Sequence, residues 1–204
     1  MSVRLIGFGA RVELRGAFRL ERGAGETTLR AWDGERDVEL DVDALLRGEQ
    51  STELFTASGG DDQAREWTIE TDVLACAWPS GFALCSDPDG VSPFLLVGSG
   101  DAMLWISGPL ARETCLPIEQ LAGDDQTVRA IAETSEGDAR IDLDYVIDGE
   151  LWWQRRYVVT WEDERALVLS AQSKASDEER VRAAIDELES SLEPTAPRAA
   201  DLPS

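Results

Sequence analysis

Carboxylates, aromatic rings and arginines are the residues of this sequence that could do chemistry, because histidine is absent altogether. Without imidazole the usual proton shuttle, the Ser/His and Cys/His nucleophile pairs and the commonest transition-metal ligand are missing. Acidic residues do occur in close pairs, namely Asp41/Asp43, Asp87/Asp89, Asp124/Asp125 and Asp142/Asp144. Such pairs arise readily by chance in a chain with 41 acidic residues. We therefore predict no catalytic residue, no metal site and no cofactor from them.

Two of these pairs have a specific structural interpretation. Asp142 and Asp144 alternate with apolar residues as in a strand, which predicts a solvated sheet face rather than an acid/base pair. Asp87-Pro88-Asp89-Gly90 lacks the remaining ligands of a calcium loop. The glycines of Val3–Ala10 resemble a dinucleotide-binding turn, but Val12 stands where a third glycine is expected and a strand pattern follows, so no nucleotide site is predicted.

The segment with the strongest binding character is Leu151-Trp152-Trp153-Gln154-Arg155-Arg156-Tyr157. Strand alternation puts Trp152, Gln154 and Arg156 on one face and Trp153, Arg155 and Tyr157 on the other. One interpretation is structural: one tryptophan belongs to the core and the other packs under a helix. The alternative is that Trp152, Arg156 and Gln154 form part of a partner-binding surface, since aromatic residues and arginine are enriched in binding hot spots.

The charge balance restricts the choice of partner. With 19 basic and 41 acidic residues the net charge is −22, which strongly disfavours binding to a phosphate backbone and makes nucleic acid an improbable partner. An acidic exterior attracts a basic protein through electrostatic steering. The expected partner is therefore a protein, and a basic one.

The cysteines and the N-terminus indicate the compartment. Cys76, Cys85 and Cys115 form an odd set without a CxxC pair, and each has apolar neighbours, which predicts buried reduced thiols. The apolar run before Arg11 is too short for a signal peptide or a membrane span. We expect a cytoplasmic protein without membrane insertion.

The sequence predicts that most of the segments that position these residues are antiparallel strands. Asp33-Gly34 and Asp148-Gly149 are the dipeptides best suited to tight hairpin turns. Asp41 or Asp43 is expected to cap a short helix through Leu46. Apolar runs predict further strands at 11–15, 17–21, 73–78, 82–85, 94–97, 102–107, 128–134, 140–147, 151–161 and 166–170.

The last predicted element is a single amphipathic helix near the C-terminus. Ser176 with Glu179 fits a capping box, and Val181, Ile185, Leu188 and Leu192 form one apolar stripe. Such a helix most economically packs across one face of the sheet.

From Trp78-Pro79-Ser80-Gly81-Phe82, through the hairpin Tyr145–Tyr157, to Ala166–Ser173 and an acidic helix ending in Ser190-Ser191-Leu192, the chain resembles the PsbP-like superfamily. This group includes bacterial accessory proteins of the DcrB and LpqN type. The resemblance covers about residues 67–193 and implies a central antiparallel sheet flanked by helices, with a binding or accessory role. It supplies no catalytic residues to carry over.

We therefore expect an α+β fold, in which an antiparallel meander is packed by a C-terminal helix and preceded by an additional N-terminal β-rich segment. The expected organisation is a β-hairpin segment at 1–50, a loop or linker at 51–66, the α+β domain at 67–193 and a disordered tail at 194–204.

The expected function is that of a non-catalytic, protein-binding factor of a bacterial cytoplasm. It would be a chaperone-like accessory adaptor, or an immunity or inhibitor protein for a basic partner. The alternative is a carboxylate-based enzyme, with or without a divalent ion, which requires aspartates with raised pKa values to converge in a pocket. Self-association through an exposed sheet edge is a further alternative.

Overall fold

The structure, a computed structural model, describes residues 2–23, 27–32, 36–50, 55–60, 65–133, 137–160 and 164–195. The chain divides into two compact units: Met1–Phe94 with Glu187–Ser204 form the first, and Leu95–Asp186 form the second. The division therefore falls after Phe94 and not in the segment 51–66, where a linker was expected. The N-terminal strands form one unit with the chain as far as Phe94.

The first unit contains a six-stranded sheet in the order β16-β8-β7-β1-β2-β6. All its pairings are antiparallel. Its strands are β1 (Val3–Gly7), β2 (Ala10–Leu14), β6 (Phe55–Gly59), β7 (Thr68–Glu70), β8 (Leu74–Ala77) and β16 (Glu193–Pro194).

Strand β6 corrects the expectation of a loop throughout 51–66, because Phe55–Gly59 pairs along its whole length with β2. Residues 51–54 and 61–64 of that segment lie outside the described residues. Likewise the predicted tail begins with β16 at Glu193–Pro194, which pairs with β8. Residues 196–204 lie outside the described residues.

The glycine-containing segment Val3–Ala10 forms the β1–β2 hairpin. Gly7 pairs with Ala10 at its end. A Cβ atom on Gly7 would lie 2.4 Å from the backbone oxygen of Glu66, so this glycine permits a close approach of two backbones.

The first unit also contains neighbouring strands in the order β9-β3-β4-β5. These are β3 (Arg19–Arg22), β4 (Thr28–Trp32), β5 (Asp37–Asp41) and β9 (Phe82–Cys85). The β4–β5 pairing confirms the hairpin expected around Asp33-Gly34, although residues 33–35 themselves lie outside the described residues. Asp41 caps helix α1 (Val42–Leu46) as predicted, since its side chain accepts hydrogen bonds from the backbone N–H groups of Asp43 and Ala44.

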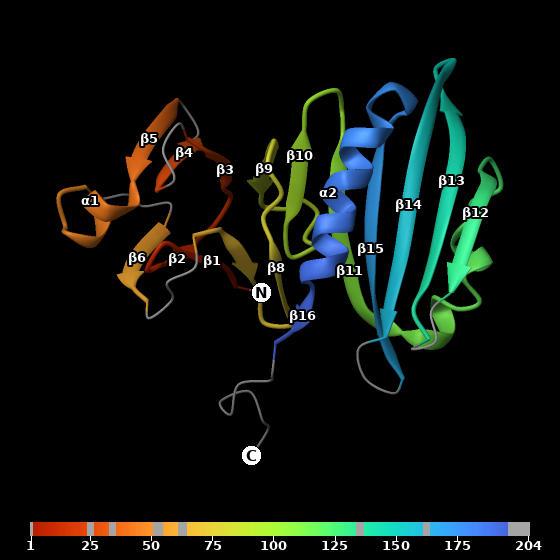
Figure 1. The fold of residues 1–204 in the computed structure, drawn as a ribbon, viewed down its shortest axis with the longest axis horizontal. Coiled ribbons are helices and arrows are strands. Elements are labelled where there is room, and N and C mark those ends of the chain that lie inside the picture. Colours follow the sequence, from red (N-terminus) through yellow and green to blue (C-terminus); the bar gives the residue numbers. More distant parts are fainter. Residues whose placement is uncertain are drawn as a thin grey trace. The chain divides into compact units, whose positions relative to one another are not determined.

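The second unit is built on an antiparallel sheet in the order β12-β13-β14-β15-β11-β10, which confirms the expected meander (Figure 1). Asp148 and Gly149 turn the β13–β14 hairpin with φ angles of 52° and 81°. The strands are β10 (Leu95–Gly98), β11 (Met103–Ala111), β12 (Thr127–Glu133), β13 (Ala139–Ile147), β14 (Glu150–Thr160) and β15 (Arg165–Lys174).

Part of one face of this sheet is covered by the connection between β11 and β12. This connection contains the 3₁₀ turns η1 (Arg112–Thr114) and η2 (Ile118–Leu121). Cys115 and Ile118 are completely buried against strand residues. The strand residues of this core are Ala139, Ile141, Leu143, Val158, Ala166 and Val168.

The opposite face carries the part of the C-terminal helix α2 (Glu178–Ser191) that belongs to this unit, as far as Asp186, which confirms the predicted packing helix (Figure 1). Its apolar stripe is buried at Val181, Ala184, Ile185 and Leu188. The helix begins directly after the 3₁₀ turn η3 (Ala175–Asp177), which contains Ser176. It is too short and too polar to cross a membrane, as are the other helices in the described part of the chain.

The three cysteines are free, as predicted. Cys76 and Cys115 are buried and Cys85 is partly exposed. Burial raises the pKa of the Cys76 thiol, which therefore stays protonated at neutral pH.

Candidate functional site

The sheet of the second unit has two faces of different chemistry. Trp153 and Arg155 lie on the face covered by α2, and Trp152, Gln154 and Arg156 lie on the other, because successive side chains of a strand alternate. This confirms the alternation expected from the sequence. Trp153 is 0% exposed. The guanidinium of Arg182, on α2, lies 4.9 Å from the centroid of its ring.

The helix-covered face holds a connected cluster of ion pairs. Arg155 Nε lies 2.7 Å from Oδ1 of Asp142, and its Nη1 lies 2.6 Å from Oδ1 of Asp186 on α2. Arg182 binds both Asp142 and Glu178, at 2.9 and 2.6 Å. The charges of these side chains are therefore mutually compensated.

Asp142 was expected on a solvated face, and this prediction is wrong: the residue is 7% exposed. It is buried because Arg155, from the neighbouring strand, and Arg182, from the helix, both reach it. Burial alone would raise its pKa, but the hydrogen bonds and charges of the two arginines outweigh burial and hold the pKa below its ordinary value.

The other face is the one that the β11–β12 connection covers in part, at Ile141 and Leu143, and we call its remainder the open face. Residues directly opposite each other on paired strands share a side of the sheet. The register of the pairings from β13 to β10 therefore shows which residues belong to the open face. Trp152 and Gln154 are 8% and 5% exposed, and the other members are partly exposed. The open face comprises Leu95, Val97, Met103, Trp105, Tyr145, Trp152, Gln154, Arg156 and Gln172.

No member of the open face is acidic, although the whole chain contains 41 acidic residues. Arg156 is its charged member. At the rim Lys174, directly opposite Trp152, pairs with Glu150 at 2.6 Å. The open face therefore combines aromatic and apolar side chains with one cation, in contrast to the strongly acidic composition of the chain.

Polar contacts order the centre of the open face. The Tyr145 hydroxyl lies 3.4 Å from Oε1 of Gln172, and the Tyr145 and Trp152 rings are 6.3 Å apart between centroids. Gln126, from the loop before β12, donates a 2.8 Å hydrogen bond to Gln154. The side-chain oxygen of Gln154 therefore already accepts a hydrogen bond from this loop.

Two hydrogen-bond donors of the open face are buried without a partner in the described part of the chain: Trp152 Nε1 and Arg156 Nε. Burial lowers the pKa of Arg156, and the nearby Tyr145 only partly opposes this shift. Leaving a buried donor unpaired costs on the order of 1–3 kcal/mol, and more when the group is charged. A ligand that supplies acceptors here would recover that free energy.

Sequence reasoning placed Trp152, Gln154 and Arg156 together on this face, and it missed their neighbours on the same face: Tyr145, Met103, Trp105, Leu95, Val97 and Gln172. A signal for Tyr145 was present, because the Asp148-Gly149 turn sets the hairpin register and places Tyr145 opposite Trp152. The others reach the face through pairings between strands distant in sequence.

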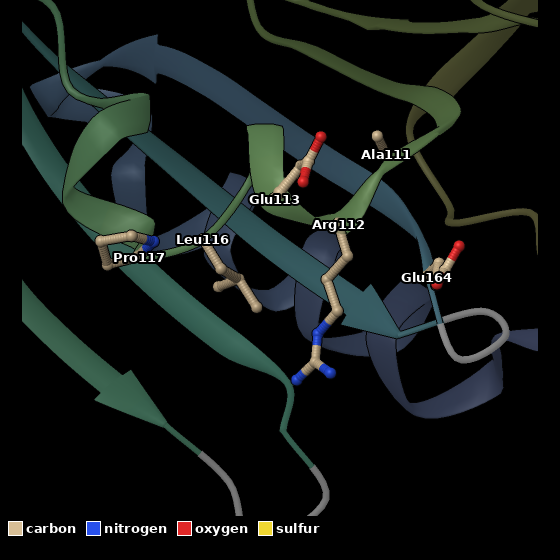
Figure 2. A pocket seen from close by; sticks show the side chains of 6 residues that line it. All are labelled: Ala111, Arg112, Glu113, Leu116, Pro117 and Glu164. Atoms are coloured by element: carbon tan, nitrogen blue, oxygen red, sulfur yellow. The ribbon is translucent and has the colours of Figure 1, made fainter.

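A separate surface hollow of about 590 Å³ lies near η1, lined by Ala111, Arg112, Glu113, Leu116, Pro117 and Glu164. Figure 2 shows that the Arg112 side chain extends away from Glu113 and Glu164. The charged groups of this hollow therefore do not converge on one point as an acid/base centre requires.

The remaining aspartate pairs have structural roles or lie apart. Asp87 accepts hydrogen bonds from the backbone N–H groups of Ser92, Asp89 and Val91, which hold its pKa below the ordinary value. Asp124 and Asp125 are exposed. Within the described ranges, no group of three or more Cys, Asp or Glu side chains is arranged to hold a metal ion.

No protein-family model and no curated protein sequence matches this chain. Among solved structures it is similar to LpqN of Mycobacterium tuberculosis, a protein involved in cell envelope biogenesis, with 16% identity and a TM-score of 0.34. The match covers 58% of this chain and 73% of that one. At so low a TM-score the comparison carries no conclusion about this chain, and the PsbP-like resemblance stays a prediction.

Proposed function

We propose that this chain is a non-catalytic protein-binding factor whose partner binds the open face of the second unit. The observation that supports this proposal most strongly is an acid-free, aromatic sheet face with two unpaired buried donors in a chain of net charge −22. A face that served only as a solvated exterior would share the acidic composition of the rest of the sequence.

The residue types of the open face are those of protein interfaces. Tryptophan, tyrosine, methionine and arginine are enriched in the centre of interfaces, whereas aspartate, glutamate and lysine are depleted there. Trp105, Trp152, Tyr145 and Arg156 are the candidates for the largest contributions, because tryptophan, tyrosine and arginine dominate binding hot spots.

The acidic charges outside the open face support a partner of net positive charge. Their field would accelerate the approach of a basic protein, while the open face forms the contact. An accessory or chaperone-like adaptor and an immunity or inhibitor protein both fit this description. The free cysteines favour a reducing compartment, and we propose the cytoplasm.

A carboxylate-based enzyme is the weaker alternative. Asp87 and Asp142, which belong to two of the aspartate pairs, both have lowered pKa values. A general acid requires a raised pKa.

The test is an affinity capture from a lysate of the source organism, followed by measurement of the dissociation constant with the purified partner. The double variant Trp152→Ala/Arg156→Ala should weaken binding by about 100-fold, as expected for two hot-spot residues. The matched control Trp32→Ala/Arg15→Ala also removes one tryptophan, 42% exposed, and one exposed arginine, both from the first unit, and should bind normally.

Circular dichroism and thermal unfolding of both double variants show whether they fold. A folded Trp152→Ala/Arg156→Ala variant that binds the partner as tightly as the parent chain would refute the proposal.

A further inference from the structure

We infer that the partner binds the open face through an extended segment that places a carboxylate on the Arg156 guanidinium and a backbone carbonyl on the Trp152 indole. This inference rests on the proposed function and specifies the chemistry of the partner at that site.

Two consecutive arginines of β14 differ in their partners. Arg155 contacts Asp142 and Asp186 on the helix-covered face. Among the residues that the structure describes, the Arg156 side chain, on the open face, has no ion-pair or hydrogen-bond partner, and its Nε is buried. It is partly buried among Ile141, Ser170 and Tyr145, which removes water from the guanidinium without supplying an anion.

A carboxylate is the group that best completes such a site. The planar guanidinium presents paired N–H donors that match the two oxygens of a carboxylate, and hydrogen bonds between ionised groups are about twice as strong as neutral ones. A basic group of the partner has no counterpart here, because the open face contains no acidic residue. Burial raises the pKa of Tyr145, and the charge of Asp125, in the loop before β12, acts in the same direction.

Trp152 supplies the second fixed point. Its indole N–H is a donor only, is buried without a partner, and lies on the same face as Arg156. The two residues are four positions apart on β14, which corresponds to about 13 Å at the rise of a strand. An extended segment of about four residues spans this distance.

The side chains around the two donors are mostly aromatic or apolar, which favours a partner segment with apolar side chains. Tyr145 and Trp152 pack against each other, and Met103, Trp105 and Val97 continue the surface across β11 and β10. The recognised segment therefore combines apolar side chains with an Asp, a Glu or a C-terminal carboxylate near one end.

The experiment is selection of a random heptapeptide display library on the immobilised full chain, followed by affinity measurement of the enriched peptides. Enriched peptides should carry one carboxylate next to apolar residues. Arg156→Ala should weaken them by about tenfold or more, and Arg156→Lys should retain part of the affinity. Trp152→Phe keeps a ring but lacks the donor, and should weaken them by about threefold to tenfold.

Charge reversal gives the sharpest readout. A library selected on Arg156→Glu should yield lysine or arginine in place of the carboxylate. The Trp32→Ala/Arg15→Ala control should enrich the same peptides as the parent chain.

The outcomes separate the inference from the proposed function. Peptides that lose affinity in Trp152→Ala but carry no carboxylate, or tolerate Arg156→Ala, overturn the inference and leave the open face as a binding surface. If no enriched peptide is sensitive to Trp152→Ala or Arg156→Ala, both the inference and the proposed function are refuted.

Discussion

Arg182 Nη1 lies 2.9 Å from Oδ2 of Asp142, which joins helix α2 directly to strand β13. The same carboxylate binds Arg155 through its other oxygen, at 2.7 Å. One buried aspartate therefore compensates two arginines and couples the helix to two strands.

Replacing Asp142 by alanine should lower the free energy of unfolding by about 3–5 kcal/mol, because the completely buried Arg155 would lose its bidentate partner. Urea unfolding followed by tryptophan fluorescence measures this loss. Glu119→Ala, which removes an exposed carboxylate of η2, is the control and should change stability by less than about 0.5 kcal/mol. Equal stability of the two variants would show that the ion cluster contributes nothing to folding.

The stability difference between the parent chain and Asp142→Asn should depend on pH. The pKa of Asp142 is lowered in the folded state, so its stabilising contribution is complete above the unfolded value of about 3.9 and disappears as pH falls through the folded value. Unfolding free energies measured from pH 7 downwards should therefore converge for the two chains below about pH 4. A difference that stays constant over this range would contradict a lowered pKa.

Gly149→Ala should destabilise the second unit by about 1–2 kcal/mol, because Gly149 has a φ of 81° in the β13–β14 turn. The position is sterically open, with no atom within 4 Å of an added Cβ, so the cost is conformational only. Gly149→Asn should cost less, since asparagine tolerates this backbone region better. Thermal unfolding compares the two variants, and an asparagine variant less stable than the alanine variant would contradict this explanation.

Association with a basic partner should depend on ionic strength in its rate constant. Between about 0.01 and 1 M salt the Debye length falls from about 30 to about 3 Å, so the association rate constant should fall by tenfold or more. The dissociation rate constant should change little with salt and should instead rise in Arg156→Ala. Stopped-flow measurements separate the two constants, and association insensitive to salt would argue against steering.

Local signals in the sequence predicted the β4–β5 and β13–β14 hairpins, the C-terminal helix and the α1 cap. Asp148-Gly149, Asp41 and the stripe that includes Val181 and Ile185 each act within a few residues of chain. Strands β1 and β6 were not predicted. β1 was missed because it ends in a glycine turn that resembles a dinucleotide-binding turn. β6 (Phe-Thr-Ala-Ser-Gly) was missed because it has a single large apolar residue and is specified by its pairing with β2.

The candidate site was predictable to the extent that it lies on one hairpin. Alternation along β14 places Trp152 and Arg156 together, and hairpin register adds Tyr145. Met103 and Trp105 join through β15, whose pairing with β11 spans distant parts of the chain. Asp142 was expected in solvent although Arg155 lies opposite it in the same hairpin, because its second partner, Arg182, is brought to it by the distant helix α2.

Strand β12 is the outermost described strand on its side of the sheet in the second unit, and all its side chains are exposed. Its register with β13 shifts between Val128 and Ala130, and Arg129, at the irregularity, is held by Glu178 and Asp144. Such a shift bends the outer row of backbone donors and acceptors, so that a foreign strand can align with only part of it. We therefore expect this edge to oppose open-ended growth of the sheet into fibres.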